Sequence, residues 1–380
     1  MSTIGQIVTI TKSKKATDAK NNLENFVNKI NKHLQEYFDK ELNNTSQQKA
    51  SKQQINIRKH IFKHIKEHNL RPAKRLRSSF IYYAYKMLHG KNDKAIINAA
   101  MSIELIQTAL LIHDDFMDQD EIRRGRATTH KFYEEYHKGN NYKGDPAHYG
   151  NSMAINAGDI ALCLGYEILG KSQFSSEKKL KALNKLFRGI ANTAFGQAYD
   201  ITLENKAQAS EKEILDMYKA KTAVYTYENP LHIGAILAGA KEQDLKILSD
   251  YAIPGGIAFQ LQDDILGLFG NPEKTGKPAH SDLRQGKMTL LITKALELSN
   301  THQKQKLSLL WGKRNLSDTE AQEARNIVIN TGSLEYCKRL SIKWAKKAQE
   351  AISSMRNKRW EEEGINYLDG IAQYMIEREM

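Results

Sequence analysis

The chain has 380 residues, with 40% hydrophobic and 27% charged residues and a formal net charge of +13 at pH 7. These values are typical of a soluble globular protein with a sizeable core, and the 6 prolines and 23 glycines favour long helices over many short strands. The positive charge favours an anionic partner such as nucleic acid, a phosphorylated metabolite or an acidic membrane surface, although a lysine-rich solvated surface explains it equally well.

The two cysteines, Cys163 and Cys337, lie far apart and in no metal-ligand spacing. This argues against a disulfide framework and a structural zinc site, and it predicts a cytoplasmic location. The N-terminus lacks the apolar core of a signal peptide. The most apolar long run, residues 95–113, contains Glu104 and Gln107, so it predicts a buried helix rather than a membrane span.

In chain order, residues 1–17 form a polar, flexible lead, apart from a brief strand-like alternation at 4–10. Apolar residues recur at helical spacing over 18–42, which predicts an amphipathic helix, and residues 43–54 have the composition of a linker. Helical patterns then continue to the end of the chain. The stops between them are Gly90, Gly125, 138–151, Gly170, Pro254–Gly255 and 270–278. The sequence therefore predicts an all-α fold with a single large helical domain over residues 18–380.

The stretch "LIHDDFMDQDEIRRG" (111–125) places carboxylates at the end of an apolar helix. Asp114 and Asp118 are spaced i, i+4 and share a face, with Asp115 one residue further round. A helix C-terminus disfavours anions, so a cation is expected there. Mg²⁺ binds one or two carboxylates and completes its shell with substrate phosphates. Arg123 and Arg124 follow directly, and forked arginine donors suit phosphate oxygens.

A second stretch, residues 254–277, repeats this order. Four of its residues share one helix face at i, i+3, i+4 and i+7: Gln260, Asp263, Asp264 and Gly267. The lysines after this helix are Lys274, Lys277 and Lys287, with Asp282 among them. Two such helix ends predict a cavity in which facing acidic clusters grip a diphosphate through Mg²⁺.

These motifs resemble those of the trans-isoprenyl diphosphate synthases, the all-helical prenyltransferases. The resemblance rests on five segments in the family's order: "PAKRLRS" (72–78), "HDDFMDQDEIRRGRATTH" (113–130), "FGQAYD" (195–200), "YKAKTAVYTY" (218–227) and "AFQLQDDILG" (258–267). It implies the isoprenoid synthase fold, with helices around a central apolar cavity, and a homodimer.

The resemblance also implies a role for each matching residue. The catalytic set is Asp114, Asp115, Asp118, Lys221, Thr222, Gln260, Asp263 and Asp264, of which Asp114, Asp118 and Asp263 bind metal, with three Mg²⁺ ions per active site. The substrate-binding set is Lys74, Arg75, Gln107, Arg123, Arg124, Gln197, Lys277 and Lys287. Lys74 and Arg75 are expected to grip isopentenyl diphosphate, while Lys221 and Thr222 support the allylic diphosphate.

Four positions depart from the family's pattern. Pro72 and Ala73 replace two glycines, Ser78 replaces a proline, Gln107 replaces a histidine, and Gly267 replaces the last aspartate of the second motif.

Product length is expected to depend on Ala109, where the family places a bulky aromatic residue to close the pocket early. Alanine favours geranylgeranyl diphosphate or a longer product, with Ile106 and Leu110 as a floor. The alternative is that Ala109 is simple helix packing.

The predicted activity is condensation of isopentenyl diphosphate with an allylic diphosphate. One alternative is a non-catalytic or partner-dependent subunit of a heteromeric synthase, suggested by Gly267 and Gln107. Another is a terpene cyclase, which would not need the cations Lys74 and Arg75. The two internal acidic clusters argue against a nucleic-acid partner. The basic C-terminal segment "RNKRW" (356–360) is interpreted as a solvated face, or as a transient membrane contact for product delivery.

Overall fold

The computed structural model describes residues 13–46, 49–270 and 281–377. The helices of the first half are α1 (Lys14–Ser46), α2 (Lys52–Leu70), α3 (Leu76–Met87), α4 (Asp93–Met117), α5 (Thr129–Gly139), α6 (Pro146–Gly170) and α7 (Ser176–Lys206). The remaining helices are α8 (Glu211–Tyr218), the π-helix η1 (Lys219–Glu228), α9 (Asn229–Ala238), α10 (Glu242–Phe269), α12 (Ser281–Gln285), α13 (Leu290–Leu298), α14 (Thr301–Leu310), α15 (Asp318–Asn330), α16 (Ser333–Asn357) and α17 (Glu362–Glu377).

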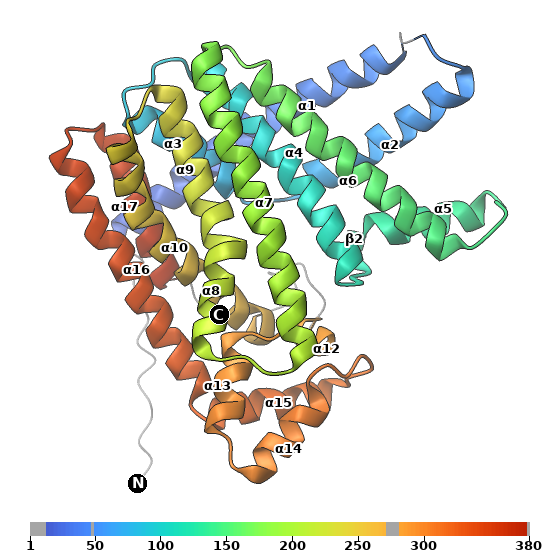
Figure 1. The fold of residues 1–380 in the computed structure, drawn as a ribbon, viewed down its shortest axis with the longest axis vertical. Helices are drawn as coiled ribbons and strands as arrows, with labels where there is room; N and C mark the ends of the chain where they lie inside the picture. Colours follow the sequence, from blue (N-terminus) through green and yellow to red (C-terminus); the bar gives the residue numbers. More distant parts are fainter. Residues whose placement is uncertain (1–12, 47–48, 271–280, 378–380) are drawn as a thin grey trace.

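This architecture confirms the predicted all-α fold (Figure 1). One feature was not predicted: two short antiparallel strands, β1 (Ile122–Arg123) and β2 (Arg126–Ala127), form a hairpin just after α4. Gly125 was expected only to stop a helix. It lies instead in the hairpin turn with a φ of 74°, a conformation that glycine adopts without strain.

The first helix boundaries differ from the prediction. Helix α1 begins at Lys14, ahead of the expected start at Asp18, and continues to Ser46, inside the expected linker. Helix α2 then begins after Ser51, whose side chain accepts a hydrogen bond from the Gln54 N–H while the Gln54 side chain accepts one from Ser51. This capping box fixes the start of the helix. The alternation expected at 4–10 lies outside the described residues.

Helix α10 runs through Pro254–Gly255, where a break was expected. A proline removes one intrahelical hydrogen bond and normally kinks a helix. The neighbouring glycine allows another helix to approach closely, because a Cβ at Gly256 would lie 2.4 Å from the Ala223 Cα of η1. The Pro-Gly-Gly segment is therefore a helix-packing site and not a stop.

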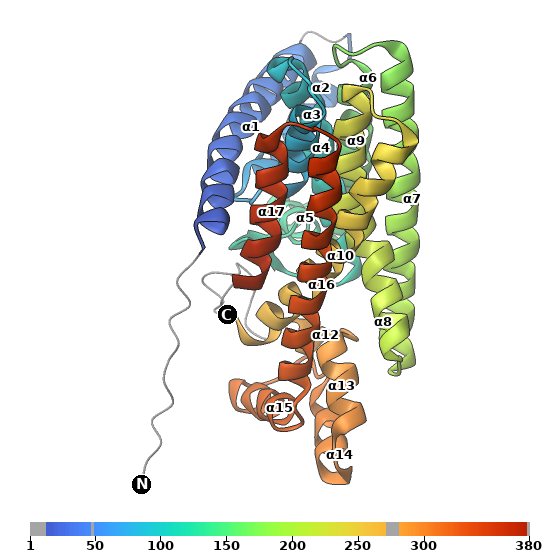
Figure 2. The ribbon, with the colours of Figure 1, turned by 90° about the vertical axis from the view of Figure 1, so that its left-hand side faces the viewer.

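Buried apolar side chains form two clusters. The larger contains α3, α4, α9 and α17, and the smaller contains α8 and α13–α15, at the lower end of Figures 1 and 2. Helices α10 and α16 contribute to both, with Tyr251 and Ile352 in the larger cluster and Leu261 and Cys337 in the smaller.

Within the described residues, two helices, α4 and α6, are long and apolar enough to span a membrane by length and composition alone. The most apolar part of α4 is 78% buried, as expected for a core helix, whereas that of α6 is only 39% buried. Helix α6 therefore leaves an apolar face uncovered in the single chain.

Candidate active site

The first carboxylate cluster lies at the C-terminal end of α4, where Asp118 is the C-cap residue. Because the negative end of the helix dipole disfavours anions, these carboxylates need cations nearby. Lys287 supplies one, with its Nζ 2.6 Å from Asp118 Oδ2. Lys221 supplies another, with its Nζ 3.9 Å from Asp114 Oδ1. Two lysines distant in sequence therefore meet the predicted pair.

Asp115 turns away from this pair and is fully buried. It accepts a hydrogen bond from Nε of Arg123, whose guanidinium also lies 3.7 Å from Asp114 and 3.4 Å from Asp120. Burial alone would lower the pKa of Arg123, but these carboxylates raise it above its ordinary value. Asp115 therefore holds the Arg123 guanidinium in place, and Arg123 is the internal counter-ion of the acidic cluster.

The π-helix η1 carries Lys221 and Thr222. Glycines of two neighbouring helices pack closely against η1. A Cβ at Gly196 of α7 would lie 2.7 Å from the Lys221 backbone nitrogen, and Gly256 of α10 packs against Ala223. Lys221 Nζ lies 2.5 Å from Asp200 Oδ2 of α7. Burial alone would lower the pKa of Lys221, but Asp200 and the first cluster raise it. Lys221 is therefore a protonated cation between α7 and α4.

The two aspartates of the second motif have different environments. Asp263 is partly exposed, whereas Asp264 is 7% exposed and accepts hydrogen bonds from the Tyr218 hydroxyl and, at 2.7 Å, from Gln260 Nε2. Burial raises the pKa of Asp264 to about 7. Gln260 in turn accepts a 2.6 Å hydrogen bond from Thr222 Oγ1. Asp264 therefore links α10 directly to α8 and, through Gln260, to η1, and its expected catalytic role stays a prediction.

The segment between α12 and α13 connects the second motif to the first. Lys287 binds Asp118, and the Gln285 side chain donates to Asp120. Burial alone would lower the pKa of Lys287, but Asp118 and Asp114 raise it well above its ordinary value. These contacts join the region of α12 and Lys287 to the end of α4, while the predicted facing of the ends of α4 and α10 stays a prediction. Lys277, also expected to bind substrate, lies outside the described residues.

The structure favours a different role for Arg75 from the substrate-binding role that was expected. It is 5% exposed, in a left-handed conformation with a φ of 49°, and its side chain points into the core. Its three guanidinium nitrogens donate to Glu104 Oε2 at 2.8 Å, Asn31 Oδ1 at 3.0 Å and the Asn69 carbonyl at 2.6 Å. Burial alone would raise the pKa of Glu104, but Arg75 lowers it. Arg75 therefore holds α3 against α4.

Arg77, two residues further on, is the better-placed cation of the same motif. It is partly exposed, donates to Thr226 Oγ1 at 2.8 Å and lies 4.8 Å from the centre of the Tyr225 ring. Its Nε is buried without a hydrogen-bond partner in the described part of the chain. Lys74 of the same motif is exposed.

Arg124 lies at the hairpin turn, with its Nη1 3.4 Å from the Arg71 carbonyl. Burial, together with the nearby charges of Arg75, Arg123 and Arg71, lowers its pKa to about 10. Such a concentration of positive charge favours an anion beside the hairpin.

Two predicted substrate-binding amides are poorly satisfied in the described residues. Gln197 is 8% exposed, and neither its Nε2 nor its Oε1 has a hydrogen-bond partner there. Gln107 Oε1 is also buried without one. Buried amides normally have partners, so these two indicate a polar ligand.

The predicted chain-length residues lie on α4. Ala109 and Ile106 are fully buried, and Leu110 packs partly buried against the same cluster. Ile106 faces α6, because a Cβ at Gly165 would lie 2.6 Å from its Cγ1. Ile106 is therefore a packing residue between α4 and α6, and the role of Ala109 stays a prediction.

Sequence reasoning missed Glu204, Tyr218 and Arg77 as members of the site. Glu204 lies one turn after Asp200 on α7, and burial, followed by the charge of Asp200, raises its pKa to about 7. Its i, i+4 spacing from Asp200 is the signal that would have indicated it.

The donors present fit a divalent cation that brings its own phosphate ligands. Among the described residues, no three His, Cys, Asp or Glu side chains gather closely enough to hold a metal alone. The carboxylates are instead divided between the ends of α4 and α10. Mg²⁺ commonly uses one or two carboxylates and completes its shell with water and phosphate oxygens.

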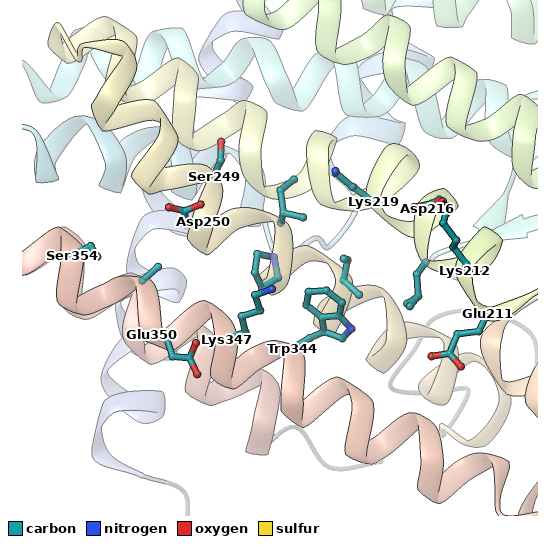
Figure 3. Close-up of a pocket in the computed structure, with 15 residues that line it drawn as sticks. Glu211, Lys212, Asp216, Lys219, Ser249, Asp250, Trp344, Lys347, Glu350 and Ser354 are labelled. Carbon is teal, nitrogen blue, oxygen red and sulfur yellow. Dashed lines mark hydrogen bonds and ion pairs between the residues drawn. The ribbon is translucent and has the colours of Figure 1, made fainter.

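A groove of about 960 Å³ lies elsewhere, on the outer side of α8, α10 and α16. Figure 3 shows Trp344 and Lys347 of α16 facing Lys212 and Asp216 of α8 across it. None of the predicted site residues lines it, so it is separate from the carboxylate clusters.

An all-helical fold with two carboxylate-bearing helix ends, lysines between them and an arginine-rich hairpin defines the class of the all-helical prenyltransferases. The family model described as polyprenyl synthetase matches residues 59–328. The chain is 34% identical over 288 residues to the geranylgeranyl diphosphate synthase of Sulfolobus acidocaldarius, covering 75% of this chain and 82% of that protein. It is 32% identical to the geranylfarnesyl diphosphate synthase of Aeropyrum pernix, covering 80% and 90%.

Among solved structures, the geranylgeranyl pyrophosphate synthase of Corynebacterium glutamicum, complexed with isoprenyl diphosphate and magnesium, superposes with a TM-score of 0.86 at 30% identity. The alignment covers 94% of this chain and 99% of that one. The chain therefore belongs to the polyprenyl synthetase family, and it is a trans-prenyltransferase.

Proposed function

We propose that the protein condenses isopentenyl diphosphate with an allylic diphosphate, using three Mg²⁺ ions, and makes geranylgeranyl diphosphate or a longer trans-polyprenyl diphosphate. The observation that carries this proposal is the carboxylate-bearing end of α4, where Lys287 and Lys221 contact Asp118 and Asp114. The names and ligands of the relatives support the same substrates and metal.

The allylic diphosphate lies between the two clusters in this proposal. Asp114, Asp118 and Asp263 hold the metal, while Lys221 and Lys287 donate to the diphosphate oxygens. When bound, Mg²⁺ neutralises the diphosphate and makes it a better leaving group. Fixed lysines add to this effect, because they stabilise the negative charge that develops on the leaving group.

Isopentenyl diphosphate lies on the arginine-rich side, near the hairpin. Lys74, Arg77 and Arg124 hold its phosphates in this proposal, and Arg77 replaces Arg75 because the Arg75 guanidinium is engaged in the core. This orientation directs the double bond at the allylic carbon. The site has no need of a protein nucleophile, and the departing diphosphate takes up the proton that is lost.

A homodimer is part of the proposal, and the exposed apolar face of α6 and α7 supports it. Ile155 and Ile160 of α6 are 45% and 36% exposed, and Phe187 and Phe195 of α7 are 45% and 70% exposed. The rings of Tyr166 and Phe187 join the two helices, with centroids 4.5 Å apart. Light scattering after chromatography tests this surface.

We expect Phe187→Glu to yield monomers, while Leu309→Glu on α14, where Leu309 is 74% exposed, leaves the mass unchanged. A dimer that persists in the Phe187 variant contradicts the choice of this face.

The proposal also includes a cytoplasmic location and a transient membrane contact for product delivery. The exposed basic residues Lys343, Lys346 and Arg356 of α16 support this contact. Co-sedimentation with vesicles that contain anionic lipid tests it. Unchanged sedimentation after Lys343→Glu and Lys346→Glu are combined would rule this face out.

Elongation assays test the activity itself. Purified protein is incubated with Mg²⁺, isopentenyl diphosphate and one allylic primer, either dimethylallyl, geranyl, farnesyl or geranylgeranyl diphosphate. Products are dephosphorylated and sized by mass spectrometry. We expect a series that ends at twenty carbons or more. A folded protein that extends none of the primers would point to a partner-dependent subunit.

A further inference from the structure

The second carboxylate cluster has a gap where the first has an aspartate. On α4, Asp114 and Asp118 are spaced i, i+4 and present two carboxylates on one face. On α10, the same spacing from Asp263 leads to Gly267, which has no side chain. By its own sequence, the second helix end therefore offers a metal only one carboxylate on this face.

The structure places another carboxylate in that gap. A Cβ built on Gly267 would lie 2.2 Å from Oδ2 and 3.3 Å from Cγ of Asp282. Carbon and oxygen atoms do not approach to 2.2 Å without a bond, so the Asp282 carboxylate already occupies the space that a side chain at position 267 would enter.

Asp282 is held there by the fold. Within α12, the Asp282 carbonyl accepts a 3.0 Å hydrogen bond from the Lys287 N–H, and the Leu283 carbonyl accepts one of 2.9 Å from Gly312. Arg284 Nη2 donates to the Leu316 carbonyl at 2.9 Å. These bonds tie α12 to the segment between α14 and α15. The position of the carboxylate is therefore set by backbone contacts and not by a long flexible side chain.

The charges around Asp282 connect it to the rest of the site. Asp282 contributes to the raised pKa of Lys287, after the larger effects of Asp118 and Asp114, and Lys287 Nζ contacts Asp118. Lys287 is therefore close to carboxylates of both α4 and α12.

We propose that Asp282 supplies the carboxylate that position 267 lacks, so that Asp263 and Asp282 form the metal-binding pair of the second cluster. The pair is then equivalent in space to Asp114 and Asp118, although its members lie on different helices. This inference rests on the proposed function, because the ligand is Mg²⁺ with a diphosphate. Loss of the last aspartate from the motif therefore does not imply a weakened site.

Metal-dependent binding of inorganic diphosphate tests the proposal without turnover. Isothermal titration calorimetry and the electron paramagnetic resonance spectrum of bound Mn²⁺ are compared for the wild type and Asp282→Asn. We expect about 10–100-fold weaker Mn²⁺-dependent diphosphate binding, the usual effect of losing a group that supports a metal. Asp250→Asn on the exposed side of α10 removes the same charge and should bind as the wild type does.

Relocating the carboxylate separates position from charge. Asp282→Ala should weaken binding like Asp282→Asn, and Gly267→Asp combined with Asp282→Ala should restore it to within about threefold, because alanine vacates the space that the new aspartate needs. Melting temperatures confirm that each variant is folded. Unchanged binding in Asp282→Asn, or a folded double variant that binds no better than Asp282→Ala, overturns the proposal. Failure of the proposed function appears differently, as a wild type that neither binds Mn²⁺-diphosphate nor elongates a primer, and it overturns both.

Discussion

Replacing Arg75 by alanine tests whether this arginine holds the fold or the substrate. Arg75 is 5% exposed and Glu104 is 4% exposed, and their side chains are 2.8 Å apart. Removing one partner of a buried ion pair costs about 3–5 kcal/mol, because the other charge stays buried and unpaired. At about 2.1 cal/mol/K per residue, the unfolding entropy of the chain is about 0.8 kcal/mol/K, so we expect the melting temperature to fall by about 4–6 °C.

Scanning calorimetry and steady-state kinetics distinguish the two roles. Arg75→Met combined with Glu104→Leu removes both charges and should recover part of the lost stability. Arg77→Ala is the matched comparison: we expect a fall of less than about 2 °C, since it loses one neutral hydrogen bond and one ring contact, but a raised KM for isopentenyl diphosphate. An Arg75→Ala protein that melts like the wild type and has a raised KM would falsify the reassignment.

Three further outcomes follow from the site. Asp114→Ala and Asp263→Ala should each abolish turnover at every Mg²⁺ concentration. A near-normal kcat in either variant would contradict the assignment of that residue as a metal ligand. The pKa of Glu204, raised to about 7 by burial and then by Asp200, exceeds its unfolded value, so its contribution to stability is present at low pH and is lost as pH rises through 7. Glu204→Gln should therefore flatten the fall in unfolding free energy between about pH 5 and 7, by up to about 1 kcal/mol after solvent screening. Denaturant titrations at both pH values that match the wild type would contradict this. Ala109→Phe should shorten the product towards farnesyl diphosphate, at a cost of about 1–3 kcal/mol from overpacking; a folded variant with unchanged product mass removes Ala109 from the length control.

The sequence was informative where local spacing decides the outcome. The helical period correctly predicted that a long helix, α4, ends at the first aspartate cluster, with Asp118 as its C-cap residue. It could not decide between Asp263 and Asp264, because neighbouring residues point about 100° apart on a helix and the inward direction is set by a distant residue. Here the Tyr218 hydroxyl of α8 donates a hydrogen bond to Asp264.

The buried position of Arg75 was not predicted for the same reason. Arg75 and Arg77 lie two residues apart in one basic motif, and their chemistry is identical. The positive φ of Arg75 turns its side chain towards Glu104, which no local pattern predicts. The carboxylate of Asp282 over Gly267 is likewise a contact between separate helices, so the motif seemed incomplete when read along the chain alone.

The site carries the charges that the proposed reaction needs, and they are paired with one another. Lys221 is bound to Asp200, and Lys287 is bound to Asp118. The carboxylates raise the pKa of both lysines and keep them protonated although they are buried. No further cost of burying these two cations therefore arises when a substrate binds. A metal-bound diphosphate can exchange partners with them, so that the lysines turn to phosphate oxygens and the carboxylates turn to the metal. Preorganised charges of this kind stabilise a leaving diphosphate with little rearrangement, which explains why a helix end that disfavours anions carries so many of them.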